Sequence, residues 1–119
     1  MRLIPIFFSA LFILTGCSSS NTEDLMNVDR AFSKRSAEDG MKRAFLEYAS
    51  DTAVILRENT MPIVGKTALT KSFRVLQDTG FALTWEPLAG DISKSGDLGY
   101  TYGIFTMLIH ANKSSQKGT

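Results

Sequence analysis

Several residue types are scarce in this 119-residue sequence, and each scarcity excludes a class of protein. A single cysteine excludes a framework of internal disulfides, and one cysteine with one histidine does not favour a zinc site. The 13 basic and 12 acidic side chains nearly balance, so the sequence lacks the basic surface expected of a protein that binds nucleic acid. The length allows one compact domain and excludes a two-domain enzyme of the barrel or doubly wound type.

Motifs that carry well-known chemistry are also missing. The sequence has no Gly-x-Ser-x-Gly elbow, phosphate-binding loop, dinucleotide-binding glycine pattern, zinc pair or calcium loop. It therefore predicts no cofactor and no metal, and it leaves the catalytic residues, if there are any, unknown.

The N-terminus has the pattern of a secretion signal. Arg2 supplies a positive charge, and an apolar stretch of 12 residues follows at 3–14. This stretch is shorter than the roughly 17–25 residues that span a bilayer. It leads into Leu14-Thr15-Gly16-Cys17, which resembles a bacterial lipobox. That resemblance implies cleavage before Cys17 and membrane attachment through acyl chains on the new N-terminal cysteine.

The residues after the cysteine favour this interpretation over a buried apolar strand with a core cysteine. The run Ser18-Ser19-Ser20-Asn21 has the composition of a flexible linker, which we place at 17–22, after a signal peptide at 1–16. Position 18 is serine and not aspartate. Under the sorting rule of enteric-type bacteria, this predicts a cell-envelope lipoprotein on the periplasmic side of the outer membrane, if the organism has one.

Hydrophobic spacing in residues 23–110 predicts three short helices, at 23–37, 41–49 and 68–77. The first has an apolar stripe of Leu25, Val28 and Phe32. Its predicted start is a capping box between Ser20 and Glu23, whereas Thr67 is the expected N-cap of the third helix.

Alternating and β-branched segments predict strands at 53–58, 61–64, 81–92 and 98–109, which makes the fold class α+β. Pro62 restricts the second strand to an edge. The last strand is apolar on both faces in its second half, so we expect it to be central and covered on both sides. Gly99 and Gly103 suggest bends or bulges in it. We expect the polar tail, 111–119, to be frayed.

Four short segments, in their order and spacing, resemble one superfamily. They are Phe45-x-x-Tyr48-x-x-Asp51-x-Ala53-Val54, Pro62-Ile63-Val64-Gly65-Lys66, Leu83-x-Trp85-x-Pro87 and Ser95-Gly96-Asp97-Leu98-Gly99-Tyr100-x-x-Gly103. From about residue 24 to residue 109, the chain resembles the SnoaL-like, nuclear-transport-factor-2-like superfamily. The best match is its secreted bacterial branch with a domain of unknown function.

This resemblance implies a cone, in which helices pack into the concave side of a strongly curved, mainly antiparallel sheet. A pocket between helices and sheet is usual in the superfamily, and homodimers through the sheet are common. Its members normally continue with two more strands, so the resemblance predicts that the domain at 23–110 is incomplete. The long strand at 98–109 would then have an unpaired apolar edge.

Four side chains are candidates for contacting a ligand. Trp85, Tyr100 and Tyr102 combine apolar rings with polar tips, which suits the wall of a binding site, although such residues also form ordinary cores. Arg57 is a candidate for pairing with an anionic ligand, and the alternative is an exposed charge beside a turn.

Four other titratable side chains could take part in catalysis, but we expect them to have structural roles. Asp51 follows the second helix and is expected to stabilise its exit turn, with a general base at the pocket rim as the alternative. His110 ends the last strand without an Asp or Ser partner at readable spacing. Asp91 and Asp97 flank a Ser/Gly turn and are expected to be turn residues.

Three functions remain open from the sequence. The leading hypothesis is a non-catalytic module that holds a small apolar or amphipathic ligand between sheet and helices. The second is an isomerase, cyclase or hydrolase of the SnoaL-like or ketosteroid-isomerase-like type, which needs an acid inside the pocket. The third is a dimerising or scaffolding protein of the envelope.

Overall fold

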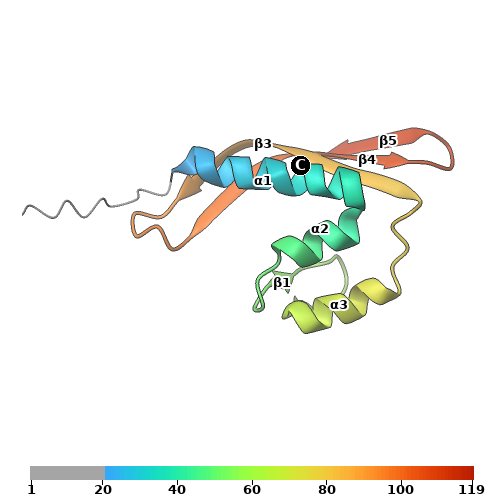
Figure 1. Ribbon diagram of the computed structural model, residues 1–119, viewed down its shortest axis with the longest axis horizontal. Coiled ribbons are helices and arrows are strands. Elements are labelled where there is room, and N and C mark those ends of the chain that lie inside the picture. Colours follow the sequence, from blue (N-terminus) through green and yellow to red (C-terminus); the bar gives the residue numbers. More distant parts are fainter. Residues whose placement is uncertain (1–20) are drawn as a thin grey trace, which may run out of the picture.

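Helices and strands alternate irregularly along residues 21–119, the part of the chain that the computed structural model describes. The order is α1 (Thr22–Asp39), α2 (Met41–Tyr48), β1 (Val54–Ile55), β2 (Ile63–Val64), α3 (Lys66–Arg74), β3 (Phe81–Ile92), β4 (Gly99–Ile109) and β5 (Ser114–Gly118). The predicted α+β class is confirmed, with three helices packed on an antiparallel sheet (Figure 1). The predicted signal peptide, Cys17 and Ser20 lie outside the described residues.

Two helices begin differently from the prediction. The side chain of Asn21 caps α1, because its Oδ1 accepts a hydrogen bond of 3.1 Å from the backbone N–H of Glu23. Thr67 lies inside α3, whose N-cap is Gly65, so that prediction was wrong. Gly65 has a φ of 87°, a backbone conformation that residues with a Cβ rarely adopt. Its N–H donates to the Ala53 carbonyl at 2.8 Å. This backbone bond fixes the entry to α3 without a side-chain cap.

The predicted hairpin at 53–58 and 61–64 exists but is short. β1 and β2 pair antiparallel through Val54↔Val64 and Ile55↔Ile63. Pro62 lies just before β2, outside the paired residues, because it cannot donate a hydrogen bond to a neighbouring strand.

The main sheet has the strand order β3-β4-β5 and is antiparallel throughout. β3 and β4 pair over their whole lengths, whereas β5 pairs with β4 from Phe105↔Gly118 to Ile109↔Ser114. The expectation of a frayed tail was therefore wrong for Ser114–Gly118. The sequence of this strand is polar and lacks the hydrophobic alternation that predicts a strand, because its backbone pairs with β4 while most of its side chains are exposed.

A β-bulge bends β3 at Leu88, between Pro87 and Ala89. On the facing strand, a Cβ at position 103 would overlap the carbonyl oxygen of Glu86, so only glycine fits there. The bulge predicted for the last strand therefore lies in its partner β3, and Gly103 allows the close approach of the two strands.

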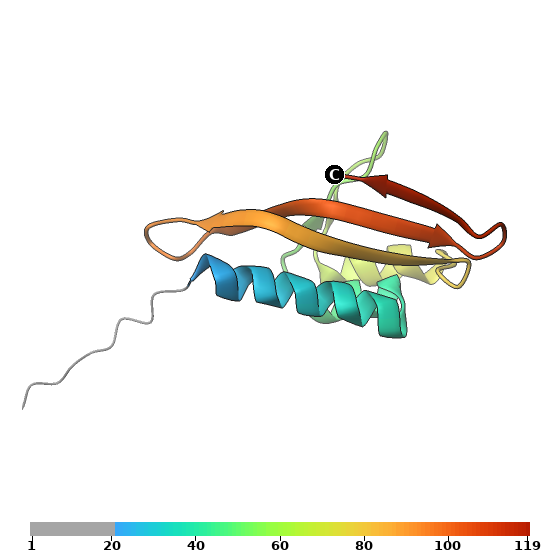
Figure 2. The same ribbon diagram turned by 90° about the horizontal axis from the view of Figure 1, so that it is seen from above.

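Helix α1 runs beside β3, along the edge of the sheet away from β5 (Figure 2), and contacts mainly that strand. Two buried serines make that contact: the Ser36 hydroxyl donates to the Leu83 carbonyl at 2.7 Å, and the Ser33 hydroxyl accepts from the Trp85 N–H at 2.8 Å. The predicted stripe was partly wrong, because Val28 is 55% exposed. The serines occupy the buried face because they satisfy backbone groups of β3 that do not pair with β4.

The face of the sheet that points away from α2 and α3 is open in the described structure (Figure 1), so the prediction that the last strand is covered on both sides was wrong. Large apolar side chains on this face are 41–60% exposed: Leu88, Tyr100, Tyr102, Ile104 and Leu108. β4 does lie between β3 and β5 along its second half. Within residues 21–119, the first half of β4 has a strand neighbour on one side. No helix in this part of the chain is long and apolar enough to cross a bilayer.

Candidate functional site

An aromatic cluster joins the helices to the sheet. The ring of Phe32 on α1 stacks on the ring of Tyr48, with 4.6 Å between centroids. It packs edge-to-face with the rings of Phe45 and Trp85, at centroid distances of 4.9 Å and 4.7 Å. Phe45 on α2 continues the chain of contacts to Phe73 on α3, at 6.3 Å. Such offset and edge-on pairs add roughly 0.5–1.5 kcal/mol beyond the area they bury. The cluster therefore fixes α2 and α3 relative to α1 and β3.

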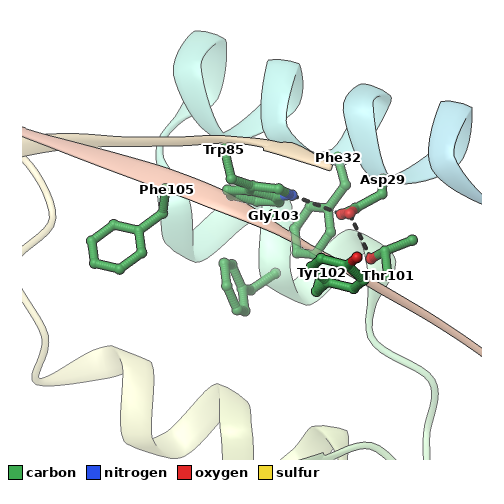
Figure 3. Close-up of a pocket in the computed structure, with 8 residues that line it drawn as sticks. Asp29, Phe32, Trp85, Thr101, Tyr102, Gly103 and Phe105 are labelled. Atoms are coloured by element: carbon green, nitrogen blue, oxygen red, sulfur yellow. Dashed lines mark hydrogen bonds between the residues drawn. The ribbon is translucent and has the colours of Figure 1, made fainter. Parts of the chain in front are cut away.

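A hollow of about 320 Å³ lies on the sheet side of this cluster (Figure 3). Its walls are mostly aromatic, and its polar groups come from Asp29 and Thr101. The lining residues are Asp29, Phe32, Phe45, Trp85, Thr101, Tyr102, Gly103 and Phe105. An apolar concavity with a few convergent polar groups is the usual form of a small-molecule site.

The carboxylate of Asp29 is the charged group of this aromatic hollow, and it is held from two strands. Its Oδ1 accepts from the indole N–H of Trp85 on β3, and its Oδ2 accepts from the Thr101 hydroxyl on β4, both at 2.7 Å (Figure 3). Each oxygen thus has a protein donor. The pair of charge-assisted bonds fixes the orientation of the Trp85 ring, which forms one wall of the hollow.

Sequence reasoning missed Asp29 as a site residue. One signal was available, because Asp29, Phe32, Ser33 and Ser36 recur at helical spacing on one face of α1. A buried tryptophan also needs an acceptor for its indole N–H. The aspartate could not be paired with Trp85 in advance, because 56 residues separate them.

The structure brings together two of the four predicted ligand contacts. Trp85 and Tyr102 line the aromatic hollow, and Tyr102 remains 60% exposed. Tyr100, also 60% exposed, lines a separate shallow hollow beside Asp91 and Leu98. Arg57 lies away from Trp85, in another hollow beyond Phe45.

The other titratable candidates lie at strand ends and turns. Asp51 is exposed in a turn, where its backbone carbonyl accepts from the Lys66 N–H at 3.1 Å. His110 is exposed just after β4, and its N–H donates to the Gly80 carbonyl at 3.0 Å. Both lie outside the lining of the aromatic hollow.

Only one of the two aspartates predicted for the Ser/Gly turn lies there. Asp97 accepts hydrogen bonds from the hydroxyls of Ser95 and Ser93, and these bonds hold the pKa of its carboxyl below its usual value. Asp91 lies within β3, paired with Tyr100, so its assignment to the turn was wrong. The strand continues past the bulge at Leu88 as far as Ile92.

Within residues 21–119, no group of three or more His, Cys, Asp or Glu side chains is placed to hold a metal ion. Comparison with models of known protein families gave no match, and neither did a search among curated proteins.

Proposed function

We propose that this protein is a lipid-anchored binding module of the cell envelope, which holds a small apolar or amphipathic ligand in the aromatic hollow. The anchor is the lipobox at Cys17, and the SnoaL-like cone is the fold we propose for the domain. Three helices on a twisted antiparallel sheet, with a hollow between α1, α2 and the sheet, support that fold.

One observation carries the binding proposal: the rings of Phe32, Phe45, Trp85 and Phe105 surround a hollow while remaining only partly buried. Aromatic side chains bury about 150–250 Å² each when covered, so a ligand that fills the hollow gains a large apolar contact. The fixed orientation of Trp85 favours binding further, because a preformed wall loses little freedom when the ligand arrives.

The same geometry favours binding over acid–base catalysis. A carboxylate that acts as a general base must direct an oxygen lone pair at the proton it removes. Both oxygens of Asp29 already accept hydrogen bonds from Trp85 and Thr101. The carboxylate therefore acts as a support for the wall of the hollow.

Two aromatic residues of β4, one on each face of the sheet, provide a contrasting test of the site. Phe105 lines the hollow, whereas Tyr100 lies on the open face and is 60% exposed. We expect the uncharged probe N-phenyl-1-naphthylamine to bind saturably and to receive excitation energy from Trp85, the sole tryptophan. Phe105→Ala should weaken this binding several-fold, and Tyr100→Ala should leave it unchanged. Fluorescence titration measures both.

Equal weakening by the two substitutions would show that the probe is not confined to the hollow and would contradict the proposal. Probe fluorescence that rises without saturation would contradict it too. Turnover of a steroid or polyketide substrate that Asp29→Asn abolishes would replace the binding proposal with the enzymatic one.

A further inference from the structure

A second hollow, of about 360 Å³, lies between α2, α3 and the start of β3. It is separate from the aromatic hollow, with which it shares Phe45. Apart from one arginine, its lining is wholly apolar: Met41, Phe45, Ile55, Phe73, Leu76 and Phe81. An apolar cavity with one charged group favours a ligand that has an apolar body and one charged end.

The arginine is Arg57, and its guanidinium has few partners. It lies over the ring of the buried Phe73, 5.6 Å from the ring centroid, and its Nη2 donates to the Ser72 hydroxyl at 3.5 Å. A guanidinium has five N–H donors in a rigid fork, so most of them remain available. Among the described residues no carboxylate forms an ion pair with Arg57, whereas Arg30 and Arg35 are each paired with two.

The surrounding segment is basic although the described chain as a whole is neutral. Residues 41–76 carry six basic side chains, Lys42, Arg43, Arg57, Lys66, Lys71 and Arg74, against three acidic ones, Glu47, Asp51 and Glu58. One of these three, Glu47, is already paired with Arg35 of α1. Lys42 is likewise paired with an acid outside the segment, Asp78, so the basic excess persists among the remaining side chains and the local field favours an anion near Arg57.

We propose that this second hollow binds a single-chain carboxylate amphiphile, a fatty acid, with its chain among the apolar side chains and its carboxylate on Arg57. Arginine matches a carboxylate in a bidentate fork, which gives both geometry and strength. The proposal goes beyond ligand binding beside Trp85 and does not depend on it, since the two hollows differ in every lining residue except Phe45.

Octanoate and octanol form a matched pair of probes, with the same chain and different charge. Isothermal titration calorimetry on the full chain should show saturable octanoate binding at neutral pH, far below the concentration at which octanoate forms micelles. Arg57→Gln should weaken octanoate at least tenfold and should change octanol binding little. Arg74→Gln, which removes the same charge from an exposed position on α3, should leave octanoate binding within about twofold.

Equal loss in Arg57→Gln and Arg74→Gln would show diffuse attraction and would overturn the proposal, as would unchanged octanoate binding in Arg57→Gln. NMR of the wild-type protein decides the matter without a variant. Saturating octanoate should shift the Nε–Hε resonance of Arg57 and the methyl resonances of Met41 and Leu76. If these three stay in place, the proposal fails, whatever occurs at Trp85. A diacyl phospholipid in vesicles that displaces octanoate competitively would contradict the assignment to a single-chain ligand.

Discussion

At the scale of single residues, Asp29 is the side chain on which the aromatic hollow depends. It joins α1 to β3 and β4 through two hydrogen bonds of 2.7 Å to Trp85 and Thr101. A hydrogen bond to a charged group contributes about 1.5–3 kcal/mol, and leaving its partner unsatisfied costs a similar amount. Partial exposure of Trp85 lets water replace some of this loss.

We therefore expect Asp29→Ala to lower the free energy of unfolding by about 2 kcal/mol. Urea denaturation followed by circular dichroism measures this without relying on the fluorescence of Trp85. Glu38→Ala is the control, because Glu38 is an exposed acid on the same helix whose 3.7 Å pair with Lys34 is worth about 0.3–0.5 kcal/mol. A loss no greater than that of the control would show that the two bonds to Asp29 contribute nothing to the fold.

Arg57 shows why a residue type does not fix a site. The sequence offered it as an anion partner but gave no means of locating it. The fold separates it from Trp85 and places its guanidinium over Phe73 at the edge of a different hollow. Its candidate role changed because its neighbours come from α2, α3 and β3, far apart in the chain.

At the scale of elements, α1 packs on β3 partly through two serine hydroxyls. Ser33 and Ser36 are buried and bond to the backbone of Trp85 and Leu83. These bonds satisfy the edge of β3 that β4 does not cover. A larger side chain at either position would separate the helix from the strand.

Ser36→Ala tests this contact, because its effect on helix propensity and its effect on the hydrogen bond to β3 have opposite signs. Alanine has the higher helix propensity, so the substitution would stabilise α1 slightly if the hydroxyl made no contribution. Because the Leu83 carbonyl loses its donor, we expect instead a loss of about 1 kcal/mol in the free energy of unfolding. Thermal and urea denaturation provide the measurement. A neutral or stabilising result would contradict a role for the serine in holding α1 to β3.

At the scale of the whole molecule, the two faces of the sheet are unequal. One face carries the aromatic hollow, which residues of α1 and α2 help to enclose, whereas the other exposes Leu88, Tyr100, Ile104 and their neighbours. The binding proposal therefore concerns the helix side. The membrane anchor that we propose is attached just ahead of α1, with residues 17–22 as the predicted connection to the domain.

The anchor is tested in a bacterial host that is supplied with a radioactive fatty acid. We expect the wild-type protein to carry the label and to sediment with membranes, because acylation of Cys17 supplies chains that partition into the bilayer at about 0.8 kcal/mol per CH₂. Cys17→Ser should abolish both the label and the sedimentation. An unlabelled wild-type protein with an intact Met1 would refute the lipoprotein proposal.

The sequence by itself determined the α+β class and the approximate positions of the three helices and of the two long strands. These follow from periodicity and from glycine and proline, which act over neighbouring residues. The tertiary structure decided that Ser114–Gly118 is a strand, that Val28 is exposed and that Asp29 meets Trp85. Each of these depends on which backbone or side-chain group lies opposite, and residues far apart along the chain supply that partner.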